Sequence, residues 1–278
     1  MRRVERAVVR GDGMDSWDPD KARALVGTFN LSERLLLWLS KDPATVFRGA
    51  YEEGVSGQWD DANALSTLRR EYPDFDALIA GQRVLDYGCG DGFQAIAMAK
   101  AGASHVVGVD LQESRLDNAR RMAGSVPNVA FSQSISEAFD VAISLNAFEH
   151  FPEPASNLRE LGDAVRIGGR ILITFGPPWF APYGAHMHFF TSCPWVNILF
   201  SERTVHRVRM LYRADGHMNM EYGPPKMTVA MFDGLIARSG LEVEHVEYRT
   251  VRNLPVSGIP ILRELFVNHI TCVLRKTA

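Results

Sequence analysis

The stretch Arg83-Val-Leu-Asp-Tyr-Gly-Cys-Gly-Asp-Gly92 places a carboxylate, Asp86, two residues before a cluster of alternating glycines. The apolar residues before the acid predict a buried strand, and the run from Gln94 to Lys100 predicts the start of a helix. Glycines at alternate positions from 88 to 92 permit a tight turn in which a ligand can approach bare backbone. Strand, glycine turn and helix in this order predict a nucleotide-type binding site.

The position of the acid narrows the choice of ligand. A dinucleotide site carries G-x-G-x-x-G, so that a pyrophosphate can rest on amide groups at the helix N-terminus, but here Phe93 occupies the place of the third glycine. Asp86 would repel a pyrophosphate, whereas it suits the cationic ammonium of a methionine moiety. A second strand ends in Asp110, about 20 residues beyond the turn, where a carboxylate can accept the ribose hydroxyls. The pair therefore predicts S-adenosylmethionine as the ligand.

On these residues the region from Gly81 to Arg170 resembles the class I S-adenosylmethionine-dependent methyltransferases, whose first motif is an acid-x-Gly-x-Gly turn and whose second strand ends in an acid. After the third strand that family often carries Gly-Asp or Asp-Ala, whereas this chain has Ser132-Gln-Ser-Ile-Ser136. The donor contacts implied by the resemblance are Asp86, Gly88, Cys89 and Gly90 at the methionine end, Asp110 and Leu111 at the ribose and the edge of the adenine, Gln133, Ser134 and Ile135 at the adenine, Asn146 after the fourth strand, and Tyr51 and Trp59 in a loop that could close over the donor.

Short apolar strands alternate with amphipathic helices between Gly81 and Phe175, which predicts an α/β fold with a parallel sheet and helices on both faces. The resemblance implies a Rossmann-like, doubly wound, seven-stranded and mostly parallel sheet. The predicted strands are 83–87, 105–110, 128–132, 139–145, 170–175, 241–249 and 269–276, and the predicted helices of the core are 92–101, 112–123, 154–166 and 226–239.

Four segments follow from the changes in periodicity along the chain. Helical patterns without strands occupy 1–80, which we interpret as an N-terminal helical segment or lid, and the donor-binding core occupies 81–175. Proline and glycine then interrupt an aromatic, His-bearing stretch over 176–225, which we interpret as an inserted cap that binds the acceptor, between strand five and the following helix. Residues 226–278 complete the core sheet.

Composition limits the partners and the compartment. The 278 residues carry a formal net charge of −3, which offers no general attraction to nucleic acid and favours a small-molecule acceptor. Three widely separated cysteines and no apolar stretch of signal-peptide length favour a reducing, cytoplasmic location. Prolines and histidines interrupt the most apolar window, Pro177 to Phe200, so no membrane span is expected. The protein is expected to be a monomer or a homodimer.

Histidines near the predicted strand ends are candidates for the general base of a methyl transfer. His186 and His188 would share a face in an extended segment, and His150 follows strand four directly. Two alternatives stay open: proximity catalysis without a protein base, and, for His150, a role in capping the next helix and fixing the loop, since methyltransferases of the ubiquinone-biosynthesis type also carry Glu-His there. The pair His186 and His188 has no further ligands with suitable spacing in the local sequence, although Glu149 and His217 could approach it in space, and we predict no metal.

Aromatic residues of the predicted cap could form an apolar acceptor pocket, with ordinary packing as the alternative. The residues are Trp179, Phe180, Tyr183, Phe189 and Phe190. A nearby arginine run, from Arg203 to Arg213, is interpreted as a solvated helix face rather than as a site for an acidic group.

The sequence therefore predicts in-line transfer of a methyl group from S-adenosylmethionine to a small molecule, with oxygen favoured as the attacking atom. Methylation of nitrogen or of carbon on an aromatic or isoprenoid acceptor is the near alternative. A regulatory protein that binds S-adenosylmethionine without transfer is the other. Transfer to RNA or protein is disfavoured, because Asn146-Ala-Phe-Glu lacks the prolines of the motif that presents a flipped base or amine.

Overall fold

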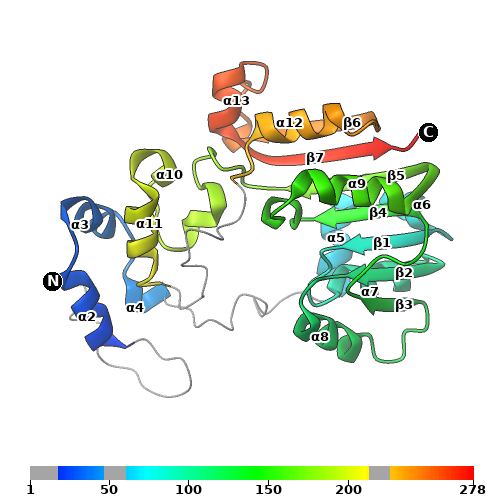
Figure 1. Ribbon diagram of the computed structural model, residues 1–278, viewed down its shortest axis with the longest axis horizontal. Coiled ribbons are helices and arrows are strands. Elements are labelled where there is room, and N and C mark those ends of the chain that lie inside the picture. The colour runs from blue at the N-terminus through cyan, green and yellow to red at the C-terminus, as the bar shows by residue number, and fades with distance from the viewer. Residues whose placement is uncertain (1–17, 47–60, 213–225) are drawn as a thin grey trace. The chain divides into compact units, whose positions relative to one another are not determined.

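The computed structural model describes residues 18–46, 61–212 and 226–278. The chain divides into two compact units (Figure 1). A helical unit combines Met1–Ser56 with Trp179–Gly223, and a sheet unit combines Gly57–Pro178 with Pro224–Ala278. Each unit is described by itself.

The sheet unit contains a seven-stranded sheet in the order β3-β2-β1-β4-β5-β7-β6. All pairs from β3 to β5 are parallel, and β7 runs antiparallel between β5 and β6. The predicted seven-stranded, mostly parallel sheet is confirmed. The strands are β1 (Arg83–Tyr87), β2 (His105–Val109), β3 (Val129–Ser132), β4 (Phe139–Leu145), β5 (Val165–Phe175), β6 (Glu242–Thr250) and β7 (Val267–Arg275).

Strand β5 begins at Val165, five residues before the predicted start, and so the preceding helix ends at Ala164. The glycine pair at 168 and 169 suggests a break, but both glycines lie within the strand. Gly168 has a φ of +85°, and a Cβ on Gly169 would lie 2.6 Å from the carbonyl oxygen of Asp140. The pair thus allows β5 to pass close to β4 across a shift in register, rather than ending the strand.

Helices cover both faces of the sheet, as the doubly wound pattern predicts. On one face, α5 (Asp61–Glu71), α6 (Phe75–Ile79) and α7 (Phe93–Lys100) bury Leu68, Phe75 and Met98 against Val84 and Leu172. On the other face, α9 (Pro154–Ala164) and α12 (Val229–Arg238) bury Leu161 and Phe232 against Leu85 and Ile173. Two further helices, α8 (Glu113–Ala123) and α13 (Pro260–Phe266), adjoin β3 and β7 respectively.

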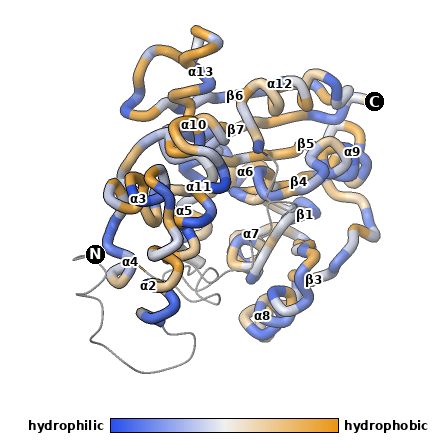
Figure 2. Tube along the Cα trace, turned by 60° about the vertical axis from the view of Figure 1, so that its left-hand side comes forward, coloured by the Kyte–Doolittle hydropathy of each residue, from blue (hydrophilic) through white to orange (hydrophobic). Residues whose placement is uncertain are grey.

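Alternate residues of β1 point to the two cores, since Val84 belongs to one apolar cluster and Leu85 to the other. Both side chains are fully buried, and burial of each such residue stabilises the fold by roughly 1.5–3 kcal/mol. Figure 2 shows the corresponding hydrophobic colours along β4 and β5. The apolar strands therefore hold the carboxyl ends of β1, β2, β4 and β5 at one edge of the sheet.

The helical unit is built from two segments that are far apart in sequence. Its elements are α2 (Pro19–Gly27), α3 (Leu31–Trp38), α4 (Pro43–Val46), the 3-10 helix η2 (Gly184–Phe189), α10 (Val196–Leu199) and α11 (Glu202–Arg209). The rings of Phe190 and Tyr212 pack at a tilt of 44° in its core, with centroids 5.2 Å apart, in the same cluster as the fully buried Leu36. The amine of Lys41 donates to the carbonyl oxygen of His188 at 2.7 Å, and the hydroxyl of Tyr212 donates to that of Lys41 at 2.7 Å.

The interpretation of the arginine run as a solvated face holds for the exposed Arg203 but is wrong for Arg207 and Arg209, and Arg213 lies outside the described residues. Arg207 lies 3.4 Å from the carboxylate of Glu33, a side chain that is fully buried. Arg209 is itself buried, with its guanidinium 5.4 Å from the centre of the Phe189 ring. Arg207 and Arg209 therefore hold α11 within the helical unit.

The predicted division of the chain into segments at residues 80, 175 and 225 stays a prediction.

Within the described ranges, no helix combines the length and the apolar character needed to cross a membrane.

Candidate functional site

The glycine turn, residues 88 to 92, joins β1 to α7 and requires glycine for two reasons. Gly88, Gly90 and Gly92 have φ values of +80°, +53° and +79°, a region that side chains disfavour. A Cβ on Gly88 would lie 2.7 Å from that of Ala147, and a Cβ on Gly92 would lie 2.7 Å from that of Ala119. The turn thus packs closely against the end of β4 and against α8, and it presents backbone rather than side chains.

Asp110 ties the end of β2 to this turn. Its Oδ2 accepts the backbone N–H of Gly90 at 3.0 Å, and its Oδ1 accepts that of Gln112 at 2.9 Å. A carboxylate offers about four acceptor positions, so further capacity remains for two ligand hydroxyls. The predicted donor residues Gly90 and Asp110 are therefore neighbours in the structure.

Asp86 is a buried acid at the carboxyl end of β1, with 2% of its surface exposed. Its Oδ2 is buried and has no hydrogen-bond partner among the described residues. The pKa of Asp86 is raised to about 7, mainly by burial; a backbone hydrogen bond from Ala95 opposes the shift, and the charge of Asp110 adds to it. A buried carboxyl with an unpartnered oxygen, beside a turn whose glycines carry no side chains, is suited to a cationic ligand group.

Cys89 lies within the turn as a packing residue. Its backbone N–H donates to the carbonyl oxygen of Val109 at 3.0 Å, and its buried thiol has a pKa raised far above the usual range by burial. A Cβ on Gly108 would lie 2.9 Å from its sulfur. The thiol is therefore held protonated, and the backbone N–H and carbonyl oxygen of Cys89 are both bonded within the sheet unit.

The predicted adenine contacts lie where β2 and β3 end. The amide of Gln133 donates to the carbonyl oxygen of Leu111 at 3.1 Å, so these two candidates are brought together. Leu111 and Ser134 are exposed, and Ile135 is half-buried against the core beneath α9. Leu111 and Ile135 are therefore the apolar candidates for contact with a flat ring.

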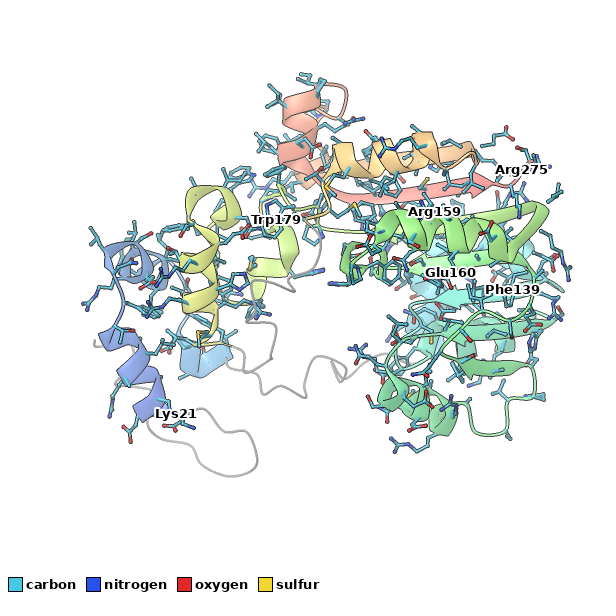
Figure 3. The ribbon with its side chains drawn as sticks, viewed as in Figure 1. Lys21, Phe139, Arg159, Glu160, Trp179 and Arg275 are labelled. Atoms are coloured by element: carbon cyan, nitrogen blue, oxygen red, sulfur yellow. The ribbon has the colours of Figure 1, made fainter. Side chains whose placement is uncertain are left out.

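Tyr87, which directly precedes the turn, is fixed from α9. Its hydroxyl donates to Glu160 at 2.6 Å and accepts from Asn157 at 2.7 Å. Glu160 is labelled on α9 in Figure 3. The ring of Tyr87 also meets Phe151 edge to face at 5.2 Å, so the strand end that carries Asp86 is held on its second face as well.

After β4, Asn146 has a φ of +50° and donates its backbone N–H to the carbonyl oxygen of Thr174 at 2.7 Å. The Glu-His pair follows in a 3-10 helix, η1 (Phe148–His150), and α9 begins only at Pro154 without a side-chain cap. The alternative in which this pair caps the helix is therefore wrong. Glu149 is buried and lies 3.5 Å from the backbone nitrogen of Gly176, so it fixes the loop after β5, while His150 is exposed.

The helical unit carries His186 and His188 on η2, both exposed. The expectation that they share a face in an extended segment is wrong, because a 3-10 helix has three residues per turn and positions two apart diverge. The ring of His188 meets Tyr183 edge to face at 4.8 Å. Their role as bases stays a prediction.

The aromatic residues proposed to line the acceptor pocket differ in burial. Phe190 is fully buried in the core of the helical unit, as in the packing alternative. Phe180 is exposed, and Trp179, labelled in Figure 3, is half-buried with its carbonyl oxygen 3.4 Å from the amide of Asn197. Tyr183 and Phe189 are half-buried. Tyr51 and Trp59 lie outside the described residues.

The sequence did not reveal a buried polar cluster at the same strand edge, which we call the Glu71 cluster: Glu71, Arg249, His269 and Thr271. Oε2 of Glu71 accepts hydrogen bonds from Arg249 and, at 3.0 Å, from the hydroxyl of Thr271. The same oxygen lies 2.9 Å from Nε2 of His269. The nearest sequence signal was a histidine near the start of the last strand. Its partner lies 198 positions away, so no local pattern could join the two.

Comparison with known proteins agrees with this geometry. Residues 85–173 match the family model described as a methyltransferase domain. The chain is 33% identical over 129 residues to a ubiquinone biosynthesis O-methyltransferase of Neisseria meningitidis serogroup C, covering 43% of this chain and 54% of that protein. It is 32% identical over 151 residues to the protein of the same name from Aromatoleum aromaticum, covering 49% of this chain and 63% of that one. The chain thus spans about half to three fifths of these relatives.

Two solved structures share the fold. An S-adenosylmethionine-dependent methyltransferase from Mesorhizobium loti aligns with a TM-score of 0.52 at 23% identity, over 80% of this chain and all of that one. A similarly described protein from Listeria monocytogenes aligns with a TM-score of 0.51 at 18% identity, over 78% of this chain and 99% of that one. At these identities the likeness concerns the fold.

Proposed function

We propose that this chain, in which residues 85–173 form a class I methyltransferase domain, transfers the methyl group of S-adenosylmethionine to an oxygen atom of a small organic acceptor. The observation that carries the proposal is Asp86: a buried carboxyl with an unpartnered oxygen, directly before a turn of bare backbone. The ammonium of the donor would satisfy that oxygen. Asp110, already bonded to the turn, would accept the ribose hydroxyls.

Methyl transfer requires little of the protein beyond holding the acceptor oxygen in line with the methyl carbon of the donor. The acceptor oxygen attacks the methyl carbon in line, the carbon–sulfur bond breaks with its electron pair passing to sulfur, and the acceptor proton leaves to a base or to water. In the sheet unit, the loops after β4 and β5 border the place where this occurs, and Glu149 fixes them relative to each other. His150, exposed on η1, is the base candidate of this unit, with His186 and His188 as those of the helical unit.

Oxygen is favoured as the attacking atom because the curated relatives described above carry the name O-methyltransferase. A small acceptor fits the net charge of −3, which gives no general attraction for nucleic acid. We further propose that the protein acts in the cytoplasm as a monomer or homodimer. Size-exclusion chromatography with light scattering and cell fractionation would test these two points.

Donor binding provides the first test. Calorimetric titration with S-adenosylmethionine and S-adenosylhomocysteine is expected to show one site per chain. Asp86→Asn should weaken binding of the donor by about 10- to 100-fold, because a charge-assisted hydrogen bond contributes about 1.5–3 kcal/mol. Asp117→Asn, at an exposed position on α8, is the matched control and should bind as the parent does. Equal affinity in all three proteins would refute the assignment of Asp86.

Turnover provides the second test. Mass spectrometric detection of S-adenosylhomocysteine and of a product heavier by one methylene, with a panel of hydroxylated aromatic acceptors, would establish transfer to oxygen. Products methylated on nitrogen or carbon would instead identify the near alternative. Tight donor binding with no turnover on any acceptor would favour a regulatory protein that binds S-adenosylmethionine.

A further inference from the structure

Within the sheet unit, the Glu71 cluster is held by more hydrogen bonds than an ordinary ion pair. The side chain of Glu71 is 3% accessible, and its Oε1 also receives Nε of Arg70 at 3.3 Å. The guanidinium of Arg249 donates both to Glu71 and, at 3.1 Å, to the hydroxyl of Thr271. The carboxylate is therefore fixed in position and can orient whatever it binds.

Two members of the cluster reach solvent: Arg249, with 32% of its side chain accessible, and His269, with 23%. Nε2 of His269 faces Oε2 of Glu71 at 2.9 Å, and an ionised carboxylate can only accept, so Nε2 carries the hydrogen. Burial, together with the charge of Arg249, lowers the pKa of His269 to about 4, so the ring is neutral near pH 7. Nδ1 then holds a lone pair and can only accept a hydrogen bond.

The position of His269 places this lone pair near the carboxyl ends of the parallel strands. Phe175, the last residue of β5, pairs with Ile270, so His269 lies level with Gly176. A Cβ on Gly176 would lie 3.1 Å from the Cα of His269, and the backbone nitrogen of the same glycine faces Glu149. Among the residues that the structure describes, Nδ1 of His269 makes no hydrogen bond.

Distance decides which part of an acceptor His269 could meet. The donor residues lie on β1 and β2, and β7 is separated from β4 by β5. Neighbouring strands are about 4.8 Å apart, so β7 lies about 10 Å from β4. This is too far for a group that must touch an oxygen attacking a methyl carbon near β1 and β4. It matches the far end of an extended aromatic acceptor.

We propose that His269, oriented by Glu71, is a specificity-determining residue that accepts a hydrogen bond from a hydroxyl on the acceptor, at the end remote from the methylated oxygen. The inference rests on the proposed function and names its substrate class: an acceptor with two separated hydroxyl groups. A methoxy or keto group at the remote end cannot donate, so it would leave the lone pair unmatched.

The surrounding charges argue against a carboxylate at the same position. The charged groups around His269 are Glu71, Glu149 and Glu247 against Arg70 and Arg249. Both guanidiniums already bind Glu71, so an added anion would meet the excess of carboxylates. A neutral hydroxyl is the donor that suits both the lone pair and the charge.

The experiment compares three probes whose remote group differs and whose length matches the strand spacing: 4,4′-dihydroxybiphenyl, its mono-methyl ether, and 4′-hydroxybiphenyl-4-carboxylate. Each is titrated by calorimetry into the full chain saturated with S-adenosylhomocysteine, and KM and kcat are measured where turnover occurs. The dihydroxy probe is expected to bind about tenfold more tightly than the other two, the ratio that one neutral hydrogen bond gives.

Variants assign that preference to the residue. His269→Phe should reduce the ratio to about one, mainly through KM, and His269→Gln, whose amide oxygen can accept, should restore part of it. His245→Phe, an exposed histidine on β6, is the matched control and should keep the full ratio. Affinity for S-adenosylmethionine and the midpoint of denaturation, measured for every variant, report whether the fold and the donor site persist.

The outcomes separate the two proposals. Loss of donor binding in the parent protein overturns the proposed function itself. Intact donor binding with no preference for the dihydroxy probe, or with no binding of any probe, overturns the role of His269 alone. A preference that survives in His269→Phe has the same consequence.

Discussion

Two regions at the edge of the sheet where the parallel strands end, the glycine turn and the Glu71 cluster, are built in opposite ways. The glycine turn between β1 and α7 presents backbone, held by close contacts that exclude any Cβ, and beside it Asp86 keeps an oxygen without a partner. The Glu71 cluster, on β6, β7 and α5, presents side chains, and Glu71 is surrounded by four donors. The first region lacks a partner that a ligand can supply, whereas in the second the carboxylate of Glu71 already has its donors; Nε of Arg249 is unpartnered there, and Nδ1 of His269 stays free to accept.

This difference explains which end a sequence reveals. A backbone that must adopt positive φ in a crowded place requires glycine, so the turn leaves a short and recognisable sequence motif. A cluster of Glu, Arg, His and Thr uses common residue types from three distant segments. The variants below test the contrast between the glycine turn, which presents backbone, and the Glu71 cluster, which presents side chains.

The largest effect is expected from Glu71→Ala. Removing this carboxylate leaves Arg249 without its main partner in a partly buried place, which should lower the free energy of unfolding by about 3 kcal/mol. Chemical denaturation measures the change. Asp76→Ala, which removes a 2.9 Å ion pair between half-exposed side chains, is the control and should cost less than about 1 kcal/mol. Similar losses in both would mean that the cluster is an ordinary surface pair.

The second largest effect is expected from Gly92→Ala, which tests the glycine turn. The added Cβ would meet Ala119 and Phe131 at 2.7 Å in a backbone conformation of φ +79°, so we expect a loss of about 2–3 kcal/mol and weaker donor binding. Gly81→Ala isolates the backbone cost, because its φ of +71° is similar and nothing lies within 4 Å. Its loss should be about 1 kcal/mol. If the two variants denature alike, crowding plays no part in the turn.

The third effect is a pH dependence of donor affinity. The pKa of Asp86 in the folded, ligand-free protein is about 7, above its unfolded value, and the ammonium of the donor requires the ionised form. Affinity should therefore rise about tenfold per pH unit up to pH 7 and level off above it. The same shift means that the contribution of Asp86 to stability declines as the pH rises from about 4 to 7.

Calorimetry between pH 5.5 and 8 measures this profile, and proton release should appear as a heat that varies with the ionisation enthalpy of the buffer. Asp86→Asn supplies the reference, since it should bind weakly at every pH with a flat profile. A parent profile as flat as that of the variant would show that the buried acid is already ionised in the free protein.

The smallest effect is expected from Tyr72→Phe, beside the Glu71 cluster. The variant removes a hydrogen bond of 2.7 Å between the hydroxyls of Tyr72 and Thr174, both buried, and should cost about 1 kcal/mol. A fall in Tm of a few degrees would report it. Tyr183→Phe, whose longer hydroxyl contact of 3.3 Å is exposed, should leave Tm unchanged. A larger loss in the control would contradict the role of burial.

Most of the sheet could be predicted from sequence, because runs such as Val84-Leu85 must be buried on both faces and alternate with helical patterns. The resemblance of the core to methyltransferases is likewise confirmed, since residues 85–173 match a methyltransferase domain. The predicted start of β5 was wrong, because adjacent glycines such as Gly168 and Gly169 usually interrupt a strand. Here they lie within the strand and permit its close contact with β4. Only the neighbouring strand decides between these meanings.

The candidate acceptor residues were less predictable. His186 lies on a 3-10 helix too short to leave a periodic pattern, so its direction could not be inferred from its spacing to His188. His269 became conspicuous only through a partner nearly two hundred positions away. Side-chain clusters of this kind depend on tertiary contacts, whereas strand burial and glycine turns depend on local composition.

The helical unit, finally, implies an order of folding. Its N-terminal helices bury Leu36 and Glu33 in part against Phe190, Arg207 and their neighbours, which follow after the whole parallel part of the sheet. On the ribosome these helices must wait, with apolar faces uncovered, until residues 179–212 emerge. A chain shortened to begin at Gly57 would leave Phe190 and Tyr212 uncovered in the same way. We expect such a shortened chain to need chaperones or to aggregate even where its sheet is intact.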